Sequence, residues 1–243
     1  MKKKIGITGL LIALSLLLFV GRKSFRILFT LREVVIASPT AHLTEAEIIR
    51  LSGVEMESNL LTLPLSQLEK NLRRFSWVQD VSLLKRYPGR LYIEVKEQQP
   101  LAIIQIDHWY YLNKNGEIFR QLTADDSHDF PILTGVSEKP ASLHQAVSFI
   151  EQYQKAGPSS FFGISELHWD NKQGFSVQTL RPAFRILFGK EKLADRLKKW
   201  ESVGQSLIAL SGKKQPLRVD LTYEKRVFVK VKPIKPERGK QNA

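Results

Sequence analysis

The sequence contains no cysteine, so disulfide bonds and thiol chemistry are excluded. It also lacks the common catalytic motifs, since it has no G-x-S-x-G segment and no H-E-x-x-H or H-x-x-x-H pair. The histidines are scattered along the chain, at His42, His108, His128, His144 and His168. We therefore predict that the protein is not an enzyme.

Metal and phosphate sites are equally poorly represented. The acidic cluster Asp125-Asp126-Ser127-His128-Asp129 does not have the spacing of a calcium-binding loop, and we interpret it as a solvated turn. The segment Gly212-Lys213-Lys214 lacks the upstream glycine and the following hydroxyl of a phosphate-binding loop. The sequence predicts no cofactor, no metal and no small-molecule substrate.

Acidic residues are fewer than basic ones, with 24 Asp and Glu against 37 Lys and Arg. The formal net charge is therefore +13 and the pI is about 9.9. Such a surface suits anionic lipid or a cell-wall polymer, and nucleic acid is a second class of partner with the same charge. A membrane anchor would argue against nucleic acid, and one candidate anchor is present.

Residues 5–21 form an uncharged, strongly apolar run, preceded by Lys2, Lys3 and Lys4 and followed by Arg22-Lys23. As a helix it would be ~25 Å long, slightly less than the ~30 Å hydrocarbon core that its basic flanks could help it to span. We interpret residues 5–23 as a transmembrane signal anchor, residues 1–4 as a cytoplasmic tail and residues 24–30 as a juxtamembrane linker. The side chains expected in lipid are Leu10, Leu11, Leu16, Leu17, Leu18 and Phe19.

Two other interpretations of the apolar run are weaker. A cleaved signal peptide should end in small residues, whereas this run ends in Phe19-Val20-Gly21 before two basic residues. A buried core helix better suits a run of about 10–14 residues. Because long C-terminal domains cross membranes largely regardless of charge, we expect a cytoplasmic N-terminus and an extracytoplasmic body.

Residues 31–97 are expected to form a small α+β unit with the order strand, helix, helix, strand, strand. A β-branched strand over 31–37 precedes a helix over 44–52, for which Thr44 and Glu47 form a capping box and Gly53 is the stop. A second helix begins near Pro64. Strands over 77–84 and 91–96 flank the turn Tyr87-Pro88-Gly89, and Arg86 and Glu97 are expected to stabilise their hairpin.

Residues 98–233 are expected to form a separate β domain, a mixed sheet with two flanking helices, followed by a basic tail over 234–243. Helical periodicity is present over 141–156 and 191–210. The expected strands cover 101–106, 109–112, 118–119, 164–169, 175–180, 184–188, 217–223 and 226–231.

Short motifs in one order along nearly the whole chain resemble the FtsQ/DivIB family of bacterial cell division proteins. They are Thr44-x-x-Glu47-Ile48, Leu51-x-Gly53, Asn59-Leu60-Leu61, Leu65-x-x-Leu68, Trp77-Val78, Arg86-x-Pro88, Leu91-x-Ile93-x-Val95-x-Glu97, Pro100-x-Ala102, Asn113-x-x-Gly116-x-Ile118-Phe119, Phe130-Pro131-Ile132-Leu133-Thr134-Gly135 and Val219-Asp220-Leu221-Thr222-Tyr223. The resemblance implies a short cytoplasmic tail, one membrane helix, a POTRA domain and an FtsQ-type β domain.

The resemblance also implies a function. Members of the family are scaffolds of the divisome in the bacterial inner (plasma) membrane at the septum, and their C-terminal region binds the coiled-coil partner FtsB (DivIC), which pairs with FtsL. Carried over to this sequence, that role falls on Tyr223, Arg226, Phe228 and Val229, on or near a final strand that could pair with another chain. For Val229, a position in the core is an equally good interpretation.

Two further functions stay open at this point. POTRA domains also occur in modules that assemble outer-membrane or wall components, usually in tandem and before a β-barrel. A membrane-bound wall hydrolase is a third possibility, but it needs a pair of acids or a metal site that the sequence does not display.

Overall fold

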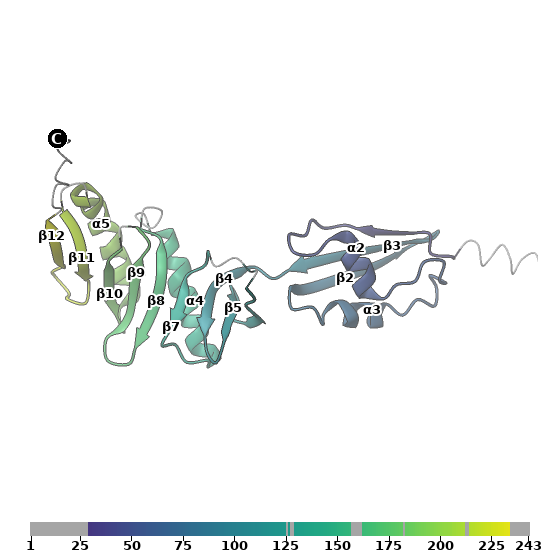
Figure 1. Cartoon of the computed structure of the whole chain (residues 1–243), viewed down its shortest axis with the longest axis horizontal. Coiled ribbons are helices and arrows are strands. Elements are labelled where there is room, and N and C mark those ends of the chain that lie inside the picture. The colour runs from purple at the N-terminus through teal and green to yellow at the C-terminus, as the bar shows by residue number, and fades with distance from the viewer. Residues whose placement is uncertain are drawn as a thin grey trace, which may run out of the picture. The chain divides into compact units, whose positions relative to one another are not determined.

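The computed structural model divides into two compact units, with the boundary between Gln98 and Gln99 (Figure 1). The expected anchor at 5–23 lies outside the described residues, and none of the helices that are described is both long and apolar enough to cross a bilayer. The structure describes residues 29–124, 126, 129–156, 162–181, 183–211 and 214–233.

The first unit is a three-stranded sheet with two helices, in the predicted order strand, helix, helix, strand, strand. Strand β3 is central, with β1 parallel to it on one side and β2 antiparallel on the other. This confirms the predicted α+β unit. The elements are β1 (Glu33–Ile36), α2 (Glu45–Ser52), α3 (Leu65–Leu72), β2 (Val78–Arg86) and β3 (Arg90–Glu97).

Helix α2 has the predicted ends. The backbone N–H of Glu47 donates to the hydroxyl of Thr44, and the Glu47 carboxylate accepts from the backbone N–H of Thr44, so the capping box is complete. Gly53 ends the helix with a φ of 73°, in the left-handed region. Both helices bury one apolar face on the sheet, through Ile48 of α2 and Leu68 and Leu72 of α3.

The segment that leads into β1 is bound to the β2–β3 hairpin through Gly89. The backbone N–H groups of Arg32 and Glu33 donate to the Gly89 carbonyl at 2.8 and 3.2 Å. Gly89 has a φ of +95°, and a Cβ at this position would lie 2.6 Å from the carbonyl oxygen of Thr30. Only glycine therefore allows the hairpin to approach the entering chain this closely.

We expect Gly89→Ala to destabilise the first unit by about 2–3 kcal/mol, because both the backbone conformation and the contact with Thr30 become strained. Gly53→Ala is the matched control. It has a φ of +73° too, but its Cβ would meet only the Asn71 side chain, at 3.2 Å, so we expect a cost of about 1 kcal/mol. Hydrogen exchange of the β3 amides measures the loss of stability in each variant. Equal protection of these amides in the two variants would contradict the close contact at Gly89.

Glu97 stabilises a different part of this unit from the one expected. Its carboxylate accepts hydrogen bonds from the backbone N–H groups of Ala41, His42 and Leu43, at 2.9–3.3 Å. It also contacts Nδ1 of His42 at 3.1 Å, and the His42 ring stacks on Trp77 with centroids 3.5 Å apart. Glu97 thus connects the end of β3 to the loop before α2, whereas the expected role was in the hairpin.

Burial acts to raise the pKa of Glu97, but the hydrogen bonds from Ala41 and His42 outweigh it, so its pKa is lowered overall. A lowered pKa means that the charged form stabilises the fold above the unfolded value of about 4.3, and that this stabilisation is lost as pH falls through the folded value. We expect Glu97→Gln to cost about 1–2 kcal/mol at pH 7 and to flatten the loss of stability between about pH 5 and 3.

The role of Glu97 is tested by measuring the free energy of unfolding of the first unit as the pH is lowered, with hydrogen exchange as the readout. Glu94→Gln is the control, because Glu94 is exposed on the same strand. If the two variants show the same pH dependence, the carboxylate of Glu97 does not stabilise the loop as described.

The second unit contains a nine-stranded mixed sheet in the order β12-β11-β10-β9-β8-β7-β4-β5-β6 and two helices. Its elements are β4 (Pro100–Gln105), β5 (Trp109–Asn113), β6 (Ile118–Gln121), β7 (Ile132–Thr134), α4 (Pro140–Lys155), β8 (Ile164–Asp170), β9 (Gly174–Thr179), β10 (Arg185–Gly189), α5 (Leu193–Ser211), β11 (Lys214–Asp220) and β12 (Phe228–Pro233). This agrees with the predicted β domain with two flanking helices.

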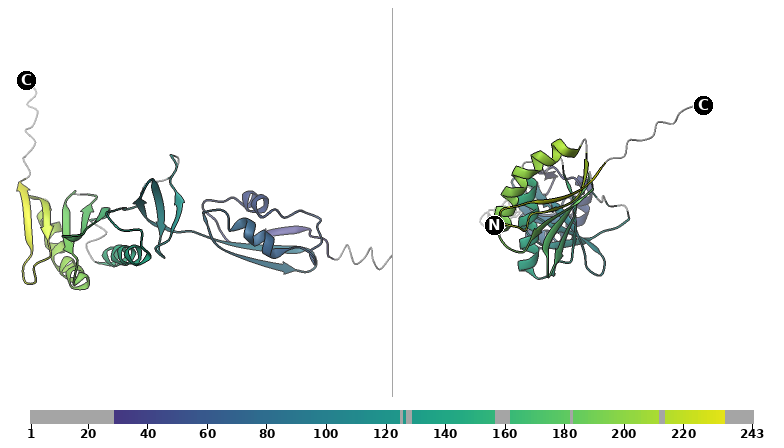
Figure 2. Two further views of the ribbon diagram at one scale, coloured as in Figure 1. Left: turned by 90° about the horizontal axis from the view of Figure 1, so that it is seen from below. Right: turned by 90° about the vertical axis from the view of Figure 1, so that its left-hand side faces the viewer.

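Each helix connects two parallel neighbouring strands. Helix α4 joins β7 to β8, and α5 joins β10 to β11. Both helices lie on the same face of the sheet (Figure 2). They bury an aromatic core there, in which Phe149 of α4 stacks on Phe175 and Tyr153 stacks on Trp200 of α5. The Tyr153 hydroxyl donates to the carbonyl of Phe162 at 2.8 Å, and burial raises its pKa.

Three strand assignments in this unit differ from the sequence-based prediction, one strand being unpredicted and two being shifted by more than one residue at both ends. One of the shifted strands is β12, which covers Phe228–Pro233 where 226–231 was expected. The three residues of β7 were not expected to form a strand, and they do so because β4 and β8 pair with them from both sides. Strand β11 ends at Asp220 and not at Tyr223. The Asp220 carboxylate accepts hydrogen bonds from the backbone N–H and the hydroxyl of Thr222, which turns the chain out of the sheet.

Candidate functional site

Strand β12 lies at one edge of the large sheet (Figure 1). It pairs antiparallel with β11 on one side, with Phe228 opposite Asp220 and Val229 opposite Val219. Its other side pairs with no strand among the described residues. An edge of this kind offers backbone N–H and C=O groups to a strand from another chain.

The four residues predicted to bind a partner are in two different environments. Tyr223, Arg226 and Phe228 are exposed, and the exposed fractions of Tyr223 and Phe228 are 53% and 50%. Val229 is partly buried against the core of the sheet, which agrees with the alternative prediction that it is a core residue. The aromatic rings of Tyr223 and Phe228 contact edge to face, with centroids 4.7 Å apart, so together they form an apolar contact beside the free edge.

The turn that carries Tyr223 is held by basic side chains at the start of α5. Lys199 Nζ donates to the carbonyl oxygens of Tyr223 and Glu224, the latter at 2.8 Å. The Arg196 guanidinium donates to the carbonyls of Phe188 and Thr222. This role was not predicted from the sequence, although in the expected helix over 191–210 the spacing of residues 192, 196 and 199 places them on one side. In the structure Lys192 immediately precedes α5. We name the three the α5 basic cluster.

The third member of the α5 basic cluster, Lys192, forms an ion pair with Glu224 at 2.6 Å. The hydrogen bond and the charges in this pair lower the pKa of Glu224 and raise that of Lys192. Both side chains are more than half exposed, so the pair adds little stability. The pair lies at a cavity of about 180 Å³ that Tyr223 and Asp195 also line.

We expect Lys199→Met to loosen the turn, because methionine keeps much of the apolar stem and removes the ammonium donor. Amides of residues 221–227 should exchange about fivefold faster, because the free energy of local opening falls by ~1 kcal/mol when the hydrogen bonds of Lys199 are lost. Lys198→Met is the matched control, since Lys198 is exposed on the same helix. Unchanged exchange in Lys199→Met would show that the turn does not depend on this lysine.

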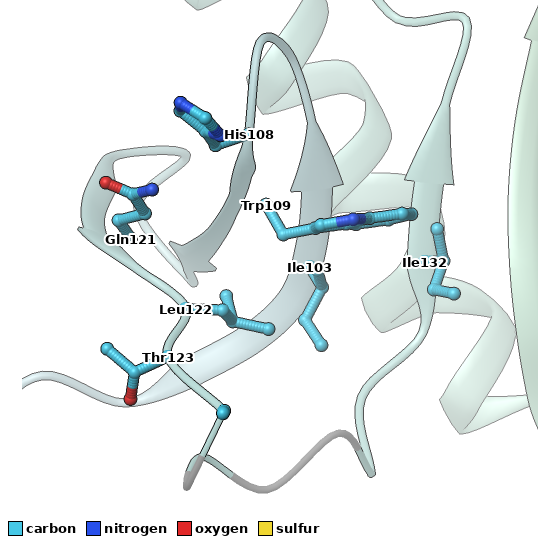
Figure 3. A pocket seen from close by; sticks show the side chains of 8 residues that line it. Ile103, His108, Trp109, Gln121, Leu122, Thr123 and Ile132 are labelled. Atoms are coloured by element: carbon cyan, nitrogen blue, oxygen red, sulfur yellow. The ribbon is translucent and has the colours of Figure 1, made fainter.

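A second cavity, of about 370 Å³, lies near the opposite edge of the sheet (Figure 3). Trp109 extends across it towards Ile132, and Ile103 and Leu122 lie beside it. Among the described residues, its lining contains no Asp, Glu, Lys or Arg but includes His108. It could accept an apolar group, and the imidazole of His108 is the one titratable side chain among the described residues that line it.

Within the described residues, no group of three or more His, Asp or Glu side chains could hold a metal ion. The acidic cluster at 125–129 is only partly described. In it, Asp126 accepts hydrogen bonds from the backbone N–H and the hydroxyl of Thr123 and lies 3.4 Å from Arg120. These contacts fit a turn that closes on itself.

Comparison with known families supplies the identity. Residues 29–98 match the family described as "POTRA domain, FtsQ-type", and residues 102–222 match "Cell division protein FtsQ/DivIB, C-terminal". The two matches cover nearly all described residues, in the order expected.

The chain belongs to the FtsQ/DivIB family of cell division proteins.

The similarity to relatives in this family extends over most of this chain and most of each relative. "Cell division protein FtsQ" of Geobacter sp. (strain M21) is 26% identical over 208 residues, which cover 82% of this chain and 75% of the relative. The protein of the same name from Geotalea daltonii is 28% identical over 200 residues, covering 77% and 71%. That from Syntrophotalea carbinolica is 25% identical over 194 residues, covering 76% and 68%.

The FtsQ/DivIB match ends at residue 222, one residue before Tyr223. Strand β12 and the predicted partner-binding residues thus lie beyond the matched region, and their role depends on the geometry of this chain. What the family establishes is a protein of cell division with a POTRA unit and an FtsQ-type C-terminal unit.

Proposed function

We propose that the protein is a membrane-anchored scaffold of the division machinery that binds FtsB (DivIC), together with FtsL, through the free edge of β12. The observation that supports this proposal is the edge strand itself, with the exposed pair Tyr223 and Phe228 beside it. Membership of a cell division family agrees with the partner class that the sequence resemblance implied.

Binding at this edge would combine two kinds of contact. A strand of the partner adds main-chain hydrogen bonds along β12, and these hold it in place without selecting a sequence. Selectivity then comes from side chains. Tyr223 and Phe228 offer a rigid aromatic contact, and interface hot spots are typically aromatic or arginine side chains. Arg226 and Lys230, both exposed, would favour acidic residues in the partner.

In this proposal the chain is fixed in the inner (plasma) membrane at the septum by residues 5–23, with its N-terminus cytoplasmic and both units outside. Its role is to gather partners for septal wall synthesis and not to catalyse a reaction. The alternative, an envelope assembly module, has less support, because one POTRA match is followed directly by an FtsQ-type C-terminal match.

We expect Tyr223→Lys and Phe228→Lys each to weaken binding of the FtsB–FtsL pair at least tenfold, because each removes half of the aromatic contact and adds a charge that must be desolvated. Trp109→Lys is the control. Its exposed fraction of 40% is similar, but β5 lies near the other edge of the sheet. Binding is measured with the full-length chain in nanodiscs.

Thermal unfolding of the three variants shows whether folding is retained. If the two β12 variants fold normally and bind the pair as tightly as the unmodified chain, the assignment of this edge is wrong. A comparable loss in Trp109→Lys would move the interface away from β12.

A further inference from the structure

The end of the first unit at which the described chain begins is also the end that carries the β2–β3 hairpin (Figure 1). The ring of Phe29, the first described residue, contacts the ring of Tyr87 edge to face at 5.4 Å. Backbone hydrogen bonds from Arg32 and Glu33 to Gly89 hold the two segments together. We call this end of the unit the hairpin end.

Among residues 29–98, which the structure describes, the exposed large apolar side chains gather at the hairpin end. They are Leu84 (57% exposed), Met56 (51%), Tyr87 (50%) and Leu61 (42%). Leu84 and Tyr87 lie at the end of β2 and in the hairpin. The carbonyl of Leu61 accepts a hydrogen bond from Lys85 Nζ at 3.1 Å, and Met56 lines a hollow with Thr30 and Arg32. Elsewhere on the described unit, large apolar side chains are at least partly buried.

Basic side chains surround this apolar group. Arg32, Arg86 and Arg90 are exposed, and Arg86 also lies over the ring of Tyr92 at 5.6 Å. The acidic residues at the same end are Glu33, which pairs with Arg90 at 2.7 Å, and Glu55 and Glu57 near Met56. The segment just before the unit adds Arg22, Lys23 and Arg26.

Aromatic, aliphatic and basic side chains at one end of a domain match the chemistry of a membrane surface. Tyrosine is favoured at the headgroup level, leucine and methionine can enter the boundary of the acyl chains, and arginine pairs with phosphate. We propose that the hairpin end rests on the lipid surface, with Tyr87, Leu84, Leu61 and Met56 as the apolar contacts and Arg32 and Arg86 on the headgroups.

The proposal rests on the membrane anchor described under the proposed function. Five residues lie between Lys23 and Phe29, and the six residue-to-residue steps span at most ~22 Å. The hairpin end is therefore kept close to the bilayer by its own chain. Contact with lipid would then fix the direction in which the first unit leaves the membrane.

The absence of cysteine from the chain makes a direct test simple. A single environment-sensitive fluorophore is attached to Thr62→Cys, which is exposed beside Leu61, in the full-length protein in nanodiscs of phosphatidylcholine and phosphatidylglycerol. A second sample carries it at Lys96→Cys, exposed on β3 and ~20 Å along the strand from Arg90. Quenching by a nitroxide on the lipid acyl chain reports contact with the bilayer.

We expect strong quenching at position 62, with a blue-shifted emission, and little at position 96. Adding Leu84→Ser and Tyr87→Ser should reduce quenching at position 62 to the level at 96. Arg86→Glu should lower it about fivefold or more in anionic discs and have a smaller effect in neutral ones. Hydrogen exchange of the β3 amides checks that the variants remain folded.

Equal quenching at 62 and 96 in folded, inserted protein would overturn the lipid contact and leave the scaffold proposal intact. Insertion is tested separately by flotation with liposomes and by resistance to alkaline carbonate. A chain that does not insert overturns both the anchor and the surface proposed here. Quenching at 62 that is unaffected by the serine substitutions would also overturn the proposal, since these side chains would then not make the contact.

Discussion

The parallel pairing of β11 with β10 decides where the last strand of the chain lies. Helix α5 carries the chain from the end of β10 back to the start of β11, so that the two strands run side by side in the same direction. One side of β11 is therefore already occupied when the chain turns back at Asp220. The returning strand β12 can pair only on the outer side, and it becomes the edge of the sheet.

The same helix that sets this topology also organises the turn at the edge. The apolar face of α5 is buried through Leu197 and Trp200, while Lys192, Arg196 and Lys199 extend to the backbone and side chains of residues 188 and 222–224. In the turn ordered in this way, the rings of Tyr223 and Phe228 are in contact with each other. A surface ordered in advance loses less conformational entropy on binding than a flexible one.

The two units present different chemistry to their surroundings. The first concentrates its exposed apolar side chains at the end from which the chain would lead to the membrane. The second combines a free strand edge with an aromatic pair at its C-terminal end. The proposed scaffold role requires no catalytic residue, and it is compatible with the basic, cysteine-free composition.

Much of the architecture could be predicted from the sequence because it depends on local interactions. The capping box of Thr44 and Glu47, the stop at Gly53 and the alternation along β3 each involve residues close together in the chain. The ordered motifs were likewise sufficient to identify the family. Other features depend on contacts between distant residues, and only the tertiary structure decided them.

Strand β7 exists because two neighbours pair with it, and Glu97 binds a loop more than fifty residues away. Whether Val229 faces the core or a partner depends on which side of the sheet its register places it. The sequence alone determined the order of the elements and the family. The fold determined which strand became the edge and which side chains surround it, because pairing between distant segments is not encoded in any single stretch of the chain.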